Sequence, residues 1–226
     1  GILEFAREAD LQDVAETLER QIRFNTAIAQ EGLRGDYGAN IGKVLLNTYG
    51  DDVKIRAKAM AAAGSDARMN GCGLPVVIVS GSGNQGLTAS LPVIEYAKEL
   101  GVDNDTLLRA LLVSDLTTIH LKTEIGRLSA YCGAVSAGCG SAAGIAWLYG
   151  REKSPEALLK DVSHTIVNTL AVDSGIVCDG AKASCAAKIA SAVDAGLLGF
   201  YMYRNGQQFR GGDGIVSKGV EATIHN

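Results

Sequence analysis

The stretch that decides the fold is RLSAYCGAVSAGCGSAAGIAWLYG, residues 127–150, which consists largely of alanine, glycine and serine. Small side chains let helices approach closely, because the distance between helix axes depends on the side chains at the contact. We interpret this stretch as a buried helix or a broken pair of helices. The whole chain has the matching composition: 47% of its 226 residues are hydrophobic, only 5% are aromatic, and 28 are glycine. The core must therefore be built from Ala, Leu, Ile and Val.

Helical spacing of apolar residues continues on both sides of this stretch. Asp10 is a suitable N-cap and Gly32 a suitable stop for the first long helix, and Ser154 with Pro155 is a typical helix start. Asp51 or Asp52 is a suitable cap for the helix over 51–71, and Gly101 is a suitable C-cap for the helix that ends at residue 100. The only β-like run is PVVIV, residues 75–79, which fits a buried extended segment or a helix turn. We predict one all-α domain over residues 1–226, with a small-residue core and very little strand. The expected helices cover residues 10–32, 39–50, 51–71, 87–100, 103–124, 154–177 and 183–203, and a last helix begins within 215–226.

Charge and hydropathy exclude some classes of partner. The net charge of −4 argues against a nucleic-acid surface, which needs a basic face. No uncharged apolar run is long enough to span a membrane, and the amphipathic, acidic start does not resemble a signal peptide. An odd count of five cysteines without a secretory signal predicts a reducing, cytoplasmic compartment.

Three of the cysteines stand among small residues, which leave room for an inorganic group. They are Cys139 in SAGCGSAAG, Cys178 in GIVCDGAK and Cys185 in KASCAAK. Thiolate sulfur is the ligand of iron–sulfur clusters, and three ligands on a four-iron cluster would leave one iron open to a substrate. Spacing alone also allows the simpler interpretation that these thiols are buried as small hydrophobes.

Other polar residues are candidates for binding or catalysis. SGSGNQG, residues 80–86, exposes backbone N–H groups before a helix, where an anion is favoured, although a plain interhelical loop fits equally. Arg68 offers a fork of donors to a carboxylate, or else forms an ordinary ion pair. His120 and Lys122 would carry protons if their helix lined a pocket. The predicted substrate-binding residues are Arg68, Ser80, Gly81, Ser82, Gly83, Asn84 and Gln85.

The cysteine segments resemble a known family. AGCGSAAG (137–144) and CDGAKASC (178–185) are similar to the GCxxxxG…CDPxxGxxxxPC pattern of the iron–sulfur L-serine dehydratase α-chain. The stretches 65–94 and 174–189 look most like the L-cysteine desulfidase branch and its serine-dehydratase-like sister group. The likeness covers essentially the whole chain, as the family's helical C-terminal domain.

The resemblance implies a function. Family members use an oxygen-labile [4Fe-4S] cluster for α,β-elimination, converting serine to pyruvate and ammonia, or cysteine to pyruvate, ammonia and sulfide. It implies Cys139, Cys178 and Cys185 as cluster ligands, gives no role to Cys72 or Cys132, and places substrate at the 80–86 segment.

In one respect this sequence differs from the family. Full-length desulfidases begin with an N-terminal region containing a GCTEP-like segment, which this sequence lacks. We expect that region to belong to the same protein or another chain, and this part alone to be inactive.

A function of another class also fits the sequence. A non-catalytic helical domain would bind a small amino acid or a partner subunit, and the small-residue helices are compatible with a homodimer. Iron analysis of anaerobically prepared protein separates this possibility from the lyase.

Overall fold

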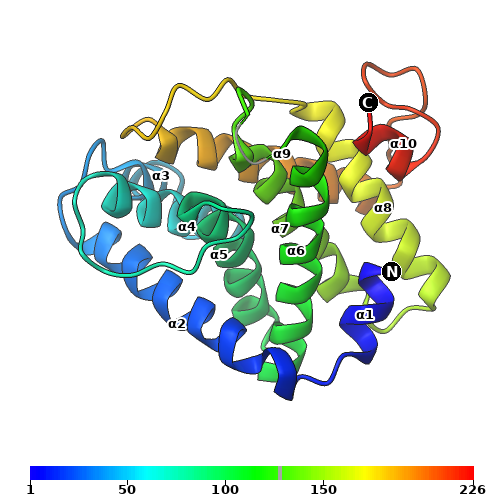
Figure 1. Ribbon diagram of the computed structural model, residues 1–226, viewed down its shortest axis with the longest axis horizontal. Helices are drawn as coiled ribbons and strands as arrows, with labels where there is room; N and C mark the ends of the chain where they lie inside the picture. Colours follow the sequence, from blue (N-terminus) through cyan, green and yellow to red (C-terminus); the bar gives the residue numbers. More distant parts are fainter. Residues whose placement is uncertain (127–128) are drawn as a thin grey trace.

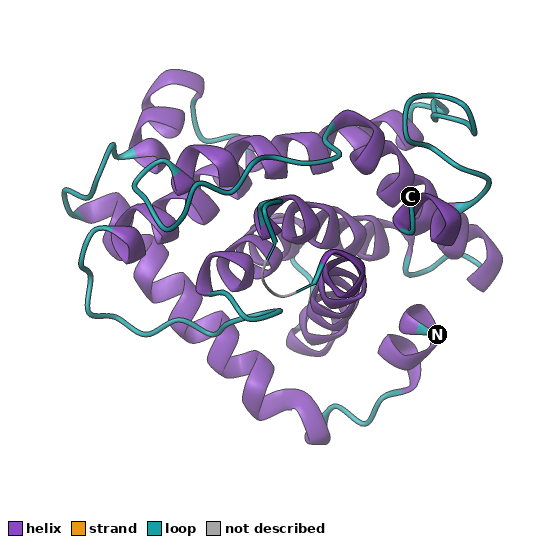
Figure 2. Cartoon of the chain, turned by 45° about the horizontal axis from the view of Figure 1, so that its top comes forward, coloured by secondary structure: helices purple, strands orange, loops and turns teal. Residues whose placement is uncertain are grey.

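Helices account for most of the computed structural model, which describes residues 1–126 and 129–226 (Figure 1; Figure 2). The all-α prediction is confirmed. The described residues form ten helices: α1 (Ile2–Glu8), α2 (Gln12–Arg34), α3 (Ile41–Tyr49), α4 (Val53–Met69), α5 (Gly83–Leu100), α6 (Asn104–Ile125), α7 (Gly133–Gly150), α8 (Pro155–Val172), α9 (Cys185–Arg204) and α10 (Val220–Ile224).

Two helices, α4 and α8, start at predicted caps. The Asp52 side chain accepts a hydrogen bond from the Lys54 N–H at the start of α4, and Ser154 accepts one from Ala157 at the start of α8. Such caps satisfy backbone donors that have no partner within the helix. Gly101 ends α5 in the left-handed conformation, with φ of 63°, which glycine adopts without strain.

Several predicted boundaries and one helix differ. The helix α8 ends at Val172, well before the predicted end at residue 177. The N-cap of α2 is Leu11, and the predicted cap Asp10 instead accepts a bond of 3.0 Å from the Gln12 N–H. The helix α2 continues past Gly32 to Arg34. Gly32 does not end the helix; its lack of a side chain lets α2 pack closely against the Ala63 backbone of α4. The helix α5 begins four residues before Leu87, and α1 was not predicted. Residues 127–128, at the start of the predicted small-residue helix, lie outside the described part of the chain.

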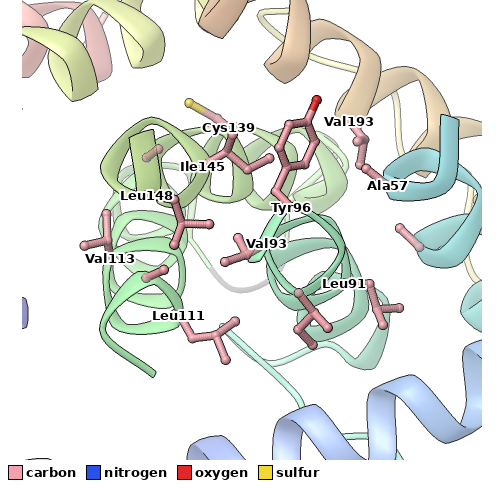
Figure 3. Close-up of a cluster of buried hydrophobic side chains, with 14 of the residues drawn as sticks. Ala57, Leu91, Val93, Tyr96, Leu111, Val113, Cys139, Ile145, Leu148 and Val193 are labelled. Atoms are coloured by element: carbon pink, nitrogen blue, oxygen red, sulfur yellow. The ribbon is translucent and has the colours of Figure 1, made fainter. Parts of the chain in front are cut away.

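The small-residue stretch forms one continuous helix, α7, at the centre of the fold. Every residue from Ala134 to Leu148 is buried, and α7 packs against α5, α6, α8 and α9. A Cβ added to Gly140 would lie 2.6 Å from the Ser114 carbonyl oxygen of α6, and one added to Gly138 would lie 2.6 Å from that of Ala192 in α9. Figure 3 shows the apolar cluster that α5, α6 and α7 build at this centre. Glycine on both faces of α7 therefore sets its distance to its neighbours.

The segment 75–79 is extended, as one of the two alternatives predicted, and it is only partly buried: Val79 at its end is 6% exposed, while Pro75 and Ile78 lie at the surface. The side chain of Ile78 is 58% exposed. The backbone of Val77 is held by the buried side chain of Asn25, which accepts a bond of 2.9 Å from its N–H and donates one of 3.4 Å to its carbonyl. Outside residues 127–128, the chain contains no sheet and only two isolated bridges, Val79–Ser82 and Tyr131–Val177.

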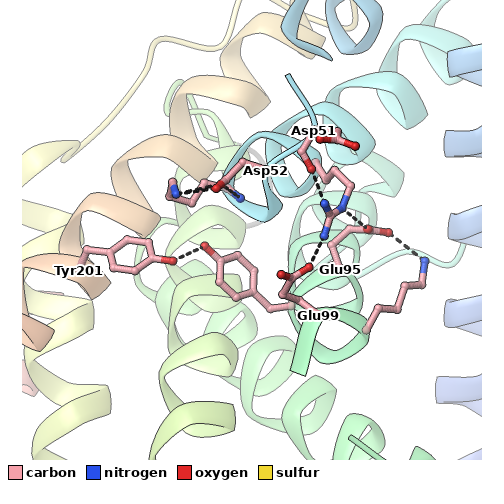
Figure 4. Close-up of polar contacts among 9 residues, drawn as sticks. Asp51, Asp52, Glu95, Glu99 and Tyr201 are labelled. Atoms are coloured by element: carbon pink, nitrogen blue, oxygen red, sulfur yellow. Dashed lines mark hydrogen bonds and ion pairs between the residues drawn. The ribbon is translucent and has the colours of Figure 1, made fainter. Parts of the chain in front are cut away.

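A polar network ties α4, α5 and α9 together (Figure 4). Arg56 of α4 pairs with the buried carboxylate of Glu95 at 3.5 Å and with Glu99 at 2.5 Å. The hydroxyl groups of Tyr96 and Tyr201 lie 2.9 Å apart. Because a buried carboxylate is costly without a partner, the Arg56–Glu95 pair fixes how α4 meets α5.

By length and composition, one described helix, α9, is apolar enough to cross a membrane. In this fold α4, α7 and α8 pack around it, and 56% of its apolar window is buried. A helix buried in a protein core can be as apolar as a membrane-spanning helix, and the packing of α9 accounts for its apolar composition.

Candidate functional site

A short backbone pairing brings two cysteines together. Residues 130–132 pair antiparallel with residues 176–178, and the backbone N–H groups of Cys132 and Cys178 each donate a bond of 2.7 Å to the opposite segment. Alternate residues of paired segments point to the same face, and diagonal neighbours on that face are within reach of each other. Cys132 and Cys178 are such neighbours, so the pairing places both side chains on one face.

The first turn of α9 brings a third cysteine to this place. The Cys185 thiol lies 3.6 Å from the carbonyl oxygen of Gly180. Lys188, one turn into α9, donates a bond of 3.2 Å to the Val177 carbonyl oxygen and pairs with the Asp179 carboxylate. These contacts hold the loop that carries Cys178 against the start of α9.

The charges of Cys178 and Cys185 both act on the Cys132 thiol, as expected for neighbouring groups; we call Cys132, Cys178 and Cys185 the thiol cluster. Burial raises the pKa of Cys132, the charges of Cys178 and Cys185 raise it further, and the Lys188 ammonium opposes them. Cys178 is exposed, and the other two are half-buried. The cluster therefore lies at the surface, where a small molecule can reach it.

Cys139, predicted as a ligand, does not belong to this cluster. Its side chain is 0% exposed at the centre of α7, and its thiol donates a weak bond of 3.9 Å to the Ile166 carbonyl of α8 (Figure 3). Burial raises its pKa to about 12, so the thiol stays protonated. It stands seven residues after Cys132, which is about 10 Å along a helix. Sequence reasoning gave Cys132 no role, although its position just before a glycine-started helix marks it as accessible.

Residues 80–86, predicted as a loop, divide into a turn at residues 80–82 and the first residues of α5. Ser80 and Gly81 form a tight two-residue turn, with φ of 50° and 88°, closed by mutual bonds of 3.2 Å between Val79 and Ser82. Positive φ at both central positions is typical of such a turn. Gly83 onward is the first turn of α5.

That first turn of α5 lies beside the thiol cluster. Gln85 packs on Gly133, the neighbour of Cys132: a Cβ added at Gly133 would lie 2.9 Å from Gln85 Oε1. Gln85 is 7% exposed, and its Oε1 has no hydrogen-bond partner in the described part of the chain. Arg68 Nη1 donates a bond of 3.2 Å to Asn84 Oδ1. The start of α5, which adjoins Cys132, thus carries an unsatisfied buried amide oxygen and is contacted by the guanidinium of Arg68 from the end of α4.

The two predicted proton-carrying residues lie apart. Lys122 is 4% exposed, and its pKa is lowered by burial while the Cys132 and Cys178 thiols act in the opposite direction. His120 Nε2 lies 2.8 Å from Glu221 at α10. Two residues along a helix turn a side chain by about 200°, so Lys122 faces the thiol cluster and His120 faces away.

The donor chemistry of the thiol cluster suits an iron–sulfur group. Three thiols from three segments are the ligands such clusters use. Across residues 1–126 and 129–226, no three His, Cys, Asp or Glu side chains are already gathered at metal-coordinating distance. Proximity and donor type therefore support the ligand set.

Comparisons with known proteins give a consistent result. The family model described as serine dehydratase alpha chain matches residues 3–226. The chain is 66% identical over 225 residues to a UPF0597 protein of Desulfitobacterium hafniense strain Y51, covering 100% of this chain and 51% of that protein. It is 60% identical to one of Lachnoclostridium phytofermentans, with 99% and 52% covered, and 40% identical to one of Bacteroides fragilis, with 100% and 52% covered. The chain thus spans about half the length of these relatives. No solved structure matches it.

Proposed function

Because this chain belongs to the serine dehydratase alpha chain family, we propose that it carries the thiol-ligated centre of a lyase acting on a small amino acid. The reaction is α,β-elimination on L-cysteine or L-serine. The observation that carries the proposal is the convergence of Cys132, Cys178 and Cys185 at one accessible place.

The ligand set that the structure favours is Cys132, Cys178 and Cys185. Cys139 was part of the set implied by the resemblance, but its side chain lies in the apolar core against α8, away from the surface where the other three thiols lie. When bound by three thiolates, a [4Fe-4S] cluster supplies an open iron that acts as a Lewis acid toward the leaving group.

Substrate binding falls to the start of α5 and the end of α4. Arg68 presents donors for the amino acid's carboxylate, and its bond to Asn84 orients the guanidinium. The unsatisfied Gln85 Oε1 accepts a hydrogen bond from the substrate ammonium group. Both side chains come from the segments that adjoin the thiol cluster.

Proton transfer at the substrate's α-carbon is assigned to Lys122 Nζ. Burial lowers the pKa of this lysine, which increases the fraction of neutral amine able to accept a proton. Loss of the α-proton and of the β-substituent, as water or as hydrogen sulfide, leaves an enamine. Its imine tautomer is hydrolysed by water to pyruvate and ammonia, which balances the reaction.

The ligand assignment is tested by anaerobic reconstitution of the intact protein with iron and sulfide. We expect about four iron atoms per chain and a visible chromophore, both lost in Cys132→Ser and Cys178→Ser. Cys139→Ala is the matched control, since it removes a thiol from the core, and it should keep its iron. Helicity measured by circular dichroism shows whether each variant folds.

Two outcomes contradict the proposal. Iron loss in Cys139→Ala with retention in Cys132→Ser would restore the ligand set with Cys139. Folded protein that takes up no iron would favour the non-catalytic helical domain. In the loaded protein, assays of pyruvate and sulfide with both amino acids identify the substrate.

A further inference from the structure

A groove of about 830 Å³ lies on the side of the fold that holds α8 and the chain after α9 (Figure 1). One wall is a face of α8, and the other is the loop of residues 205–219; we call it the α8 groove. Its volume is in the range of small-molecule sites. The length of α9, about 30 Å at 1.5 Å per residue, separates its C-terminal end from Cys185. The groove is therefore distinct from the thiol cluster.

Positive charge is concentrated around the α8 groove. Lys160, Arg210 and Lys218 line it, and no carboxylate does. None of these three cations forms an ion pair with a carboxylate, as far as the chain is described. The Asp213 carboxylate accepts a bond of 2.7 Å from the Arg210 backbone N–H, and so stabilises the conformation of the loop. Three uncommitted cations in a chain of net charge −4 favour an anionic ligand.

The wall of the groove also offers flat apolar surface. The His164 ring stacks on Tyr203, with centroids 4.7 Å apart and planes at 21°. Burial lowers the pKa of His164, and the charges of Arg210 and Lys160 lower it further, so the ring is neutral at pH 7. Phe209 adds a second aromatic side chain to the lining. A ring-containing ligand can pack on such a surface.

Buried polar side chains hold the loop in place. Asn168, which is fully buried, accepts a bond of 2.9 Å from the Phe209 N–H and donates one of 3.2 Å to the Gly199 carbonyl. Thr223, also buried, accepts a bond of 3.1 Å from the Ser217 N–H. The two anchored residues, Phe209 and Ser217, directly adjoin Arg210 and Lys218. Two of the three cations, Arg210 and Lys218, are thus carried by a loop that buried hydrogen bonds hold in place, and the third, Lys160, is carried by α8.

We propose that the α8 groove binds a small organic anion in which a phosphate group is attached to a ring-containing body, of mononucleotide size. Lys160, Arg210 and Lys218 hold the phosphate, and Phe209 with the His164 ring contacts the body. Arg suits this role because its planar fork matches phosphate oxygens.

Calorimetric titration of the intact protein tests the proposal with ADP, pyrophosphate and adenosine as probes. ADP should bind, pyrophosphate should bind at least about tenfold more weakly, and adenosine should not bind measurably. Arg210→Gln/Lys218→Gln should weaken ADP binding by more than about tenfold, since each removes a charged contact. The control is Arg20→Gln/Arg34→Gln, which removes two surface cations that already have carboxylate partners.

Three results would overturn the proposal. One is no heat of binding with ADP up to about 10 mM, which corresponds to an affinity too weak for a dedicated site. Another is equal ADP binding by the two double variants, which would show that general surface charge is responsible. The third is pyrophosphate binding as tight as that of ADP, which would show that the aromatic wall makes no contact with a ring.

Discussion

A close contact between α6 and α7 in the core gives a sharp test of the packing. We consider Gly140→Ala in α7, where an added Cβ would lie 2.6 Å from the Ser114 carbonyl oxygen and closer still to Thr118 Oγ1. Carbon–oxygen contacts require about 3.3 Å, so α6 and α7 would have to separate by roughly 0.7 Å or more. Because the Ser114 carbonyl oxygen belongs to the backbone of the neighbouring helix, rotation of the Thr118 side chain alone cannot relieve this strain.

The expected cost follows from two opposing effects. Overpacking a close-packed core costs about 3 kcal/mol at the upper end of its usual range. Alanine is about 1 kcal/mol better than glycine within a helix, which offsets part of this cost. The free energy of unfolding should therefore fall by about 2 kcal/mol, and Tm by about 4–8 °C for a chain of this length.

Urea unfolding followed by circular dichroism measures the effect, with Gly64→Ala as the matched control. A Cβ at Gly64 would lie 3.0 Å from Leu87 Cδ2, the end of a flexible side chain that can move away. That variant should be close to neutral, because the helix preference for alanine balances a small repacking cost. A Gly140→Ala protein as stable as the parent would refute the reasoning that glycine sets the α6–α7 distance.

Three other changes have defined outcomes. The Asp115 carboxylate accepts a bond of 3.1 Å from the Gln21 side chain, and burial raises its pKa to about 7. The native state therefore binds more protons than the unfolded state between about pH 4 and pH 7. The free energy of unfolding should fall by up to about 4 kcal/mol as pH rises through that window, and pH-dependent urea titrations should show this loss absent in Asp115→Asn. Asn25→Ala leaves both backbone groups of Val77 without their partner; we expect a loss of about 2 kcal/mol in urea unfolding and faster exchange of the Val77 amide. Lys122→Met should lower kcat of the reconstituted enzyme by more than about 100-fold with its iron content unchanged; loss of iron would instead show that the lysine supports the thiolates.

The helix boundaries show where local chemistry is enough to predict structure. Asp52, Ser154 and Gly101 act as caps or stops through contacts within four residues of themselves, and all three were predicted. Gly32 was predicted as a stop and is not one, because its role is set by Ala63 in another helix. A glycine that ends a helix and a glycine that admits a neighbour look the same in sequence.

The candidate site shows the same division. The sequence supplied the thiols, the polar segment at residues 80–86 and Lys122, but spacing could not decide which thiols meet. Cys132 and Cys139 are seven residues apart in one small-residue stretch of sequence and differ little in their neighbours. The pairing with residues 176–178 brings Cys132 to the loop of Cys178, while Cys139 turns into the apolar core.

What the sequence determined by itself is the all-α class, the small-residue core and the residue types available for chemistry, because composition and helical periodicity are local properties. Only the tertiary structure decided that Cys132 joins Cys178 and Cys185, that Gln85 packs beside them, and that His120 lies elsewhere. The physical reason is that these contacts join segments far apart in the chain, whose meeting depends on how closely glycine and alanine let α7 approach its neighbours.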